Sequence, residues 1–154
     1  AQLAPTKGQG VVVNHQGRSV HLLVGQGFSS QRYFWSRPSA VDYNAAGSGG
    51  SNKGTTNPDH LAQVQARLDT FLVHHPYLSK TDIPSDLLTA SGSGLDPHIS
   101  VEAANVQVKR VAEARKINPE DLQKIVLNHV EEPLLGLFGT AKVNVLQLNM
   151  ALDK

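Results

Sequence analysis

Cysteine is absent from the 154 residues of this chain. Without it the chain forms no disulfide bond, offers no thiolate nucleophile and cannot build a cysteine-ligated zinc site. Long apolar runs are missing too, because the longest, at 134–138, is far shorter than the roughly 20 residues that a membrane helix needs. The sequence therefore excludes thiol chemistry and predicts no membrane-spanning helix within these residues.

An excess of charge of either sign is also missing, with 14 basic and 13 acidic residues giving a formal net charge of +1. No basic run stands out, so we expect neither nucleic acid nor an electrostatically held membrane surface as a partner. A hydrophobic content of 40% and a charged content of 18% are typical of a globular domain. Because the chain opens at Ala1 without a signal peptide, we expect it to be processed or cut from a longer protein.

Two β-branched runs near the N-terminus, 11–13 and 18–24, predict a β-hairpin with 14–17 as its turn. Four helices are predicted after residue 56. Their start signals are Asn57-Pro58, Ser100, Asn118-Pro119 and Asn144 with Gln147, and the first helix should stop before Pro76. The predicted fold class is α+β. We expect a single domain over 1–154, with the N-terminal hairpin or small antiparallel sheet packed with about four helices.

Between 25 and 56 hydrophobic periodicity is lost, but aromatic residues cluster there. Phe28, Tyr33, Phe34 and Trp35 lie close together, with Arg32 and Arg37 beside them. Such a cluster either docks its loop onto the core, which we favour because aromatic side chains are usually buried, or anchors an interface. The composition of 47–56 is that of a flexible linker.

The stretch 83–100 is rich in small and turn-forming residues, and Gly92 and Gly94 permit a positive φ there. Ser93 superficially suggests a nucleophile elbow. That motif requires glycine two residues before and after the serine, where this chain has Ser91 and Leu95. We instead expect a shaped turn, with Asp96 hydrogen-bonding to its own backbone.

Two further motifs fail on their spacing. Lys53 lies in a glycine-rich stretch, but it follows Asn52 rather than glycine, so a phosphate loop is not predicted. His74 and His75 are adjacent and would diverge by about 100° on a helix, and no histidine pair has a helical zinc-site spacing. We expect no metal site and no catalytic residue.

Several segments in a fixed order carry more information than any one motif. They are Tyr33-Phe34-x-x-Arg37-Pro38-Ser39-Ala40, Tyr43-Asn44, 48–52, Thr56-Asn57-Pro58, Leu87-x-Thr89-Ala90-Ser91-x-Ser93-Gly94-Leu95-Asp96, Gln107-Val108-x-Arg110-Val111-Ala112-x-Ala114-Arg115 and Val143-Asn144-Val145-Leu146-x-Leu148-Asn149-x-Ala151-Leu152-Asp153. From about Val20 to the end, the chain resembles the C subunit of the potassium-transporting P-type ATPase, the KdpC family.

The resemblance implies a soluble domain on the outer side of the cell membrane, following an N-terminal membrane helix that this chain lacks. It implies partners: a channel-like potassium-binding subunit, an ATP-hydrolysing subunit and a very small membrane subunit. The family's subunit is not itself the hydrolase. It is described as a catalytic chaperone that raises the ATP affinity of the hydrolysing subunit, with a glutamine that corresponds by position to Gln107.

Two main hypotheses follow from the residues and the resemblance, with a serine hydrolase as a minor third. In the first, the domain supports assembly of the complex and binds no cofactor firmly. Its candidate partner contacts are Tyr33, Phe34, Arg37, Ser39, Asn44, Gly49, Gly50, Ser51, Asn52, Asn57, Ser91, Ser93, Gly94 and Asp96. In the second, the domain binds ATP directly through Gln107, Arg110 and the 91–94 loop. We favour the alternative for Gln107 and Arg110, in which they form the solvated face of their helix.

Overall fold

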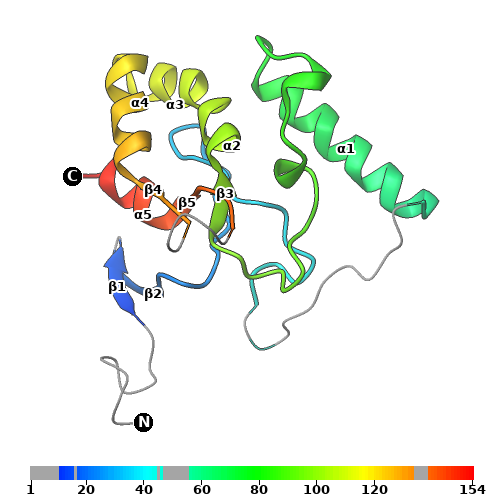
Figure 1. Cartoon of the computed structure of the whole chain (residues 1–154), viewed down its shortest axis with the longest axis horizontal. Coiled ribbons are helices and arrows are strands. Elements are labelled where there is room, and N and C mark those ends of the chain that lie inside the picture. The colour runs from blue at the N-terminus through cyan, green and yellow to red at the C-terminus, as the bar shows by residue number, and fades with distance from the viewer. Residues whose placement is uncertain (1–10, 16, 45, 47–55, 134–138) are drawn as a thin grey trace.

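The computed structural model describes residues 11–15, 17–44, 46, 56–133 and 139–154 (Figure 1). The predicted linker, apart from Thr56, lies outside the described residues. So does the run 134–138, for which the sequence suggests a short strand or a loop.

The predicted hairpin is present. Strand β1 (Val12–His15) pairs antiparallel with β2 (Arg18–His21), and His15 lies opposite Arg18. The predicted turn at 14–17 is too long, because pairing continues as far as His15. Gly17, which precedes β2, has a φ of 77°, a conformation that glycine adopts without strain.

A second sheet was not predicted from the sequence. Its strands are β3 (His98–Ser100), β4 (Val130–Glu131) and β5 (Lys142–Asn144), in the order β3-β5-β4, with both pairings antiparallel. Each strand has only two or three residues, which is too short for an alternating pattern to show in the sequence. The sheet places Val143, which is fully buried, at its centre.

Three of the four predicted helix starts are confirmed as asparagine caps. Helix α1 (Pro58–His74) begins after Asn57, α4 (Pro119–Asn128) after Asn118 and α5 (Val145–Ala151) after Asn144. In each case the asparagine side chain accepts a hydrogen bond from a backbone N–H of the first turn. Helix α1 ends before Pro76, as predicted.

The helix predicted to follow Ser100 is divided in two, which corrects the sequence-based expectation. Ser100 does cap α2 (Val101–Asn105), but α3 (Val108–Arg115) starts anew. At the break, the Gln107 side-chain Nε2 donates to the carbonyl oxygen of Ala103 at 3.0 Å, while the Gln107 backbone N–H bonds Ala104 instead. The Gln107 side-chain amide thus bonds the Ala103 carbonyl oxygen, to which the Gln107 backbone N–H would donate in a continuous helix.

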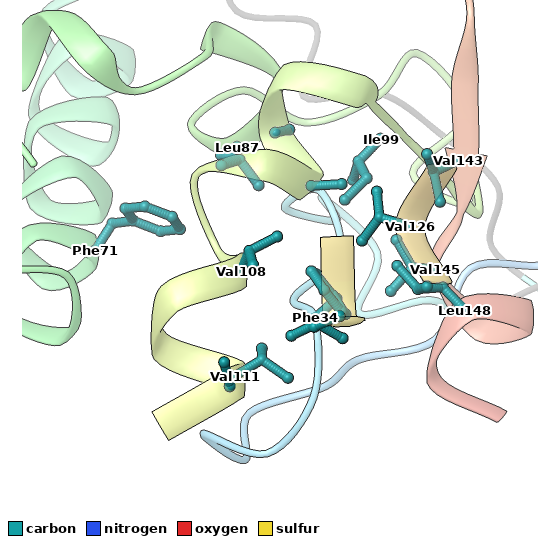
Figure 2. Close-up of a cluster of buried hydrophobic side chains, with 14 of the residues drawn as sticks. Phe34, Phe71, Leu87, Ile99, Val108, Val111, Val126, Val143, Val145 and Leu148 are labelled. Carbon is teal, nitrogen blue, oxygen red and sulfur yellow. The ribbon is translucent and has the colours of Figure 1, made fainter. Parts of the chain in front are cut away.

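The hydrophobic core is built mainly by α2 to α5 and the second sheet. Phe34, from the aromatic cluster, lies in its middle with none of its surface exposed (Figure 2). Helix α1 lies on the opposite side of the molecule from α4 and α5 (Figure 1) and contributes one buried residue, Phe71. The α+β class is confirmed, and no helix in the described ranges is long and apolar enough to cross a membrane.

Asn144 both caps α5 and fixes the chain after the hairpin, because its Nδ2 donates to the Leu22 carbonyl at 2.8 Å. It is 1% exposed, whereas Asn118 only caps an exposed helix end. We predict that Asn144→Ala lowers the free energy of unfolding by about 2–3 kcal/mol and Asn118→Ala by about 1 kcal/mol. Urea unfolding measures both, and equal losses would show that the bond to Leu22 contributes nothing.

Candidate functional site

Side chains rather than a neighbouring strand bond the backbone of Phe34 and Trp35, which follow a turn at 31–33. Asn149 accepts from the Phe34 N–H at 2.8 Å and donates to the Phe34 carbonyl at 3.0 Å. Gln107 does the same for Trp35, accepting at 2.7 Å and donating at 3.2 Å. Both side-chain amides are fully buried. Each forms the pair of hydrogen bonds that the backbone of a neighbouring strand residue would otherwise form.

The Arg110 guanidinium is the centre of this buried network. It donates to the carbonyl oxygens of Gln31 at 2.7 Å and Tyr33 at 3.0 Å. It also donates to Gln107 Oε1 at 2.8 Å and His75 Nε2 at 2.8 Å, and it lies 4.3 Å from the centre of the Trp35 ring. Burial lowers the pKa of Arg110 to about 10, which still leaves it charged at neutral pH.

His75 is neutral in this network, and its tautomer follows from its partners. Nε2 accepts from Arg110, so the proton is on Nδ1, which lies 2.8 Å from the Phe71 carbonyl oxygen. The imidazole also stacks on the Phe71 ring at 3.8 Å. Burial, with a smaller contribution from the Arg110 charge, lowers the pKa of His75 to about 4.

Arg115 holds the same segment from the other side. Its Nε donates to the Arg32 carbonyl at 2.6 Å and its Nη1 to the Leu152 carbonyl at 2.6 Å. Asp153 accepts from Arg115 Nη2 and from the Tyr33 hydroxyl, each at 2.8 Å. The favoured interpretation of the aromatic cluster, a loop docked on the core, is confirmed for Phe34; Tyr33 and Trp35 are half-buried.

The expectation that Gln107 and Arg110 form a solvated helix face is wrong. Gln107 is 0% and Arg110 4% exposed, and their polar atoms bond the chain itself. A sequence signal was available, because Ala103, Gln107 and Arg110 share helical spacing with the apolar Val111. Polar residues at core positions of a stripe need internal partners, but sequence alone does not identify them.

A second group of predicted residues meets at a cleft of about 640 Å³. Asp96 Oδ1 accepts from the His98 N–H and lies 3.0 Å from His98 Nδ1, which confirms the expected bond between Asp96 and its own backbone turn. The hydrogen bond from the His98 side chain is the main reason why the pKa of Asp96 lies below its usual value. His98 Nε2 is 3.3 Å from Glu131 Oε2, and Arg37 Nη1 is 3.6 Å from Asp96 Oδ2.

The loop after Arg37 is joined to the 91–96 turn through Ser39. The Ser39 hydroxyl donates to the Gly94 carbonyl at 2.6 Å and accepts from the Val41 and Tyr43 N–H groups. Gly94 has a φ of 70°, as its position suggested, whereas Gly92 does not have a positive φ. Arg37, Ser39, Gly94 and Asp96, all predicted as candidate partner contacts, thus lie close together, which the sequence analysis did not predict.

Other predicted contacts lie elsewhere or serve local structure. Asn57 caps α1, Asn44 accepts from the Ala46 N–H, and Ser93 Oγ accepts from the Leu95 N–H at 3.1 Å. Ser91 is 6% exposed. Gly49, Gly50, Ser51 and Asn52 lie outside the described residues.

Some cleft and network residues were not predicted. Asp86, Glu131, His75 and Asn149 have partners that are distant in sequence, so no local motif points to them. Lys142 lines the cleft without any motif of its own. Within the described ranges no group of three histidine or acidic side chains is placed to hold a metal ion.

Comparison with known proteins identifies the family to which the chain belongs. A family model described as KdpC, the K+-transporting ATPase c chain, matches residues 1–154. The chain belongs to this family. The family resemblance predicted from the ordered segments is therefore confirmed.

Curated relatives from distant bacteria carry one name, "Potassium-transporting ATPase KdpC subunit". The chain is 57% identical to that of Flavobacterium psychrophilum, over 100% of this chain and 83% of the relative. It is 54% identical to that of Bacteroides thetaiotaomicron, over 100% and 84%. For Caldanaerobacter subterraneus subsp. tengcongensis the identity is 44%, over 97% and 78%.

Removal of Arg110 tests whether its network holds the fold. Arg110→Ala leaves two carbonyl oxygens and His75 without their donor, so we predict a loss of about 3–5 kcal/mol in the free energy of unfolding. Glu113→Ala, exposed on the same helix, is the control and should change little. The single tryptophan, which contacts Arg110, reports unfolding by its fluorescence. A loss below 1 kcal/mol (roughly a surface-substitution value) would contradict a central role.

The low pKa of His75 predicts acid sensitivity in a defined window. The unfolded chain takes up the His75 proton near pH 6.5, but the folded chain does so only near pH 4. Between these values the unfolded state binds more protons than the folded state. The contribution of His75 to the free energy of unfolding is therefore fully present above pH 6.5, and it falls by about 3 kcal/mol as the pH drops towards 4. Urea unfolding across this range should show a shallower pH dependence for His75→Gln; parallel profiles would place the acid sensitivity in other groups.

Proposed function

We propose that this chain is a non-catalytic accessory subunit of an ATP-driven potassium uptake complex. Family membership and the subunit names of its relatives support this. The structural observation that supports the proposal concerns three residues of the family pattern. Gln107, Arg110 and Asn149 form their hydrogen bonds within the chain, to the backbone of segment 31–35. Such residues build a defined surface for partners rather than a reactive centre.

The partners we propose are the channel-like potassium-binding subunit, the ATP-hydrolysing subunit and the small membrane subunit. In this proposal residues 1–154 are one domain on the extracytoplasmic side of the cell membrane, attached through an N-terminal helix. Its contacts to the channel-like subunit come from Arg37 and Asp96 in the cleft lining and from Ser39 and Ser93 in the adjoining turns. Exposed parts of the aromatic cluster, such as Tyr33, also contribute.

An influence on ATP affinity fits this arrangement only as coupling between sites. A domain outside the membrane does not touch cytoplasmic ATP, so it would favour one state of the complex and thereby change nucleotide affinity. Such coupling is reciprocal for binding: if the domain raises ATP affinity, then ATP raises the affinity of the complex for the domain.

Direct nucleotide binding is disfavoured by the position of its proposed residues. Arg110 already uses four of its five N–H donors on this chain, and a phosphate would have to displace them. We therefore propose that the domain holds no nucleotide firmly. Isothermal titration calorimetry with millimolar ATP should give no binding heat, and a saturable signal lost in Gln107→Ala would reverse this conclusion.

Assembly and coupling can be tested together by omitting the chain from the complex. With the ATP-hydrolysing subunit tagged, we predict reduced recovery of the channel-like subunit when the chain is not co-expressed. We also predict that the apparent ATP affinity of the remaining complex falls about fivefold or more, since coupling free energies are typically 1–3 kcal/mol. Adding the chain back is the control. Unchanged recovery together with unchanged ATP affinity would refute the accessory role.

A further inference from the structure

The imidazole of His98 lies between two carboxylates at the second sheet. Its Nδ1 is 3.0 Å from Asp96 Oδ1, and its Nε2 is 3.3 Å from Glu131 Oε2, within ion-pair distance. A neutral imidazole has one N–H and one lone pair, so it can donate to one carboxylate but turns its lone pair towards the other. The doubly protonated ring suits both contacts. The arrangement around His98 therefore depends on a proton.

The two carboxylates differ in what else holds them. Asp96 also accepts from the His98 backbone N–H at 3.0 Å and lies 3.6 Å from Arg37 Nη1, so it stays in place when the ring is neutral. The Glu131 carboxylate has no partner besides His98 among the described residues. Loss of one ring proton would therefore leave Nδ1–H bonded to Asp96 and release Glu131.

A second cation is within reach of a released Glu131. Lys142 of β5 lies directly opposite Glu131 of β4, and both side chains are on the same face of the sheet as His98. Opposite residues of an antiparallel pair have Cβ atoms about 4.5–5.5 Å apart, which suits an ion pair between lysine and glutamate. The Lys142 ammonium makes no ion pair with the described residues while Glu131 is beside His98.

The other charged groups on this side of His98 do not compete for Glu131, because they are carboxylates. They line the cleft from the segment before β3 and from α2: Asp82, Asp86 and Glu102. Both oxygens of Asp86 accept from Ser100, and Asp82 Oδ2 accepts from Ser79. The choice of partner for Glu131 is thus between His98 and Lys142.

We propose that Glu131 exchanges partners with the protonation of His98. When the ring carries two protons, it holds Glu131; when it carries one, Glu131 pairs with Lys142. Lys142 lines the cleft, so its ammonium is unpaired towards the cleft at low pH and neutralised at higher pH. The exchange makes the charge of the cleft respond to pH. It concerns the chain alone, so its failure would leave the proposed accessory function standing.

The first experiment measures the coupling between His98 and Glu131 by urea unfolding at pH 5.5 and 8.5, which bracket the range in which histidine generally changes charge. At pH 5.5, Glu131→Gln should raise the unfolding equilibrium constant about threefold in the wild-type background and leave it unchanged in His98→Asn. Asparagine keeps a donor near Asp96 but has none at the position of Nε2. At pH 8.5 the two backgrounds should respond alike.

Glu132→Gln is the matched control for this coupling. It removes the same charge from the next residue, whose side chain is exposed and has no printed contact with the ring of His98. Its effect should not depend on His98 at either pH. A coupling between His98 and Glu131 that is equal at pH 5.5 and 8.5, or absent at both, would contradict the proposal.

The second experiment follows Lys142. Coupling between Lys142→Ala and Glu131→Gln should be absent at pH 5.5 and appear at pH 8.5, as about a twofold change in the unfolding equilibrium constant. In His98→Asn, which cannot hold Glu131, this coupling should be present at both pH values. Coupling that ignores both pH and His98 would show that Lys142 and His98 do not share Glu131.

A third measurement needs no variant to fold. Nitrogen-15 NMR of the wild-type chain reports the protons on the two ring nitrogens of His98 separately. On raising the pH, Nε2 should lose its proton while Nδ1 keeps its own, and the carboxyl carbon of Glu131 should change its shift over the same pH range. Loss of the Nδ1 proton first, or a Glu131 signal that does not follow the ring, would overturn the inference.

Discussion

The buried guanidinium of Arg110 is the constraint on which the remaining structure depends. A charge inside a protein must be surrounded by acceptors, and this one takes two main-chain carbonyls, an amide oxygen and an imidazole nitrogen. Those acceptors come from segment 31–35, from the residue that precedes α3 and from the residue that follows α1. One ionised group thereby joins three parts of the chain. The neutral tautomer of His75 and the position of Trp35 follow from it.

Arginine and carbonyl oxygen form the recurring pair of this molecule. Arg110 and Arg115 use it to hold a non-periodic segment on the core without a partner strand. Arg37 differs, because it lies beside a cleft and its Nη1 is 3.6 Å from Asp96 Oδ2. Its guanidinium is therefore paired with a carboxylate instead of a carbonyl oxygen.

Local signals in the sequence predicted the helix starts and the hairpin. Features that depend on partners distant in sequence were not predicted. Asparagine followed by proline or a first-turn acid predicted helix starts because a cap is decided within a few residues. The break before Gln107, the strands of two or three residues and the burial of Arg110 were missed. Each depends on groups far away in sequence, such as Trp35 for Gln107 and Gln31 for Arg110. At the cleft, the family pattern named Arg37 and Asp96 as candidate partner contacts, but only the structure shows that they form an ion pair.

The ties between the two ends of the chain have a consequence for biosynthesis. Asn149 holds Phe34 across 115 residues, Asp153 holds Tyr33 across 120 and Asn144 holds Leu22 across 122. A chain still on the ribosome lacks all three bonds until residues 144–153 have emerged. The hairpin and the aromatic cluster therefore remain without these bonds until then, and residues 144–153 complete the fold.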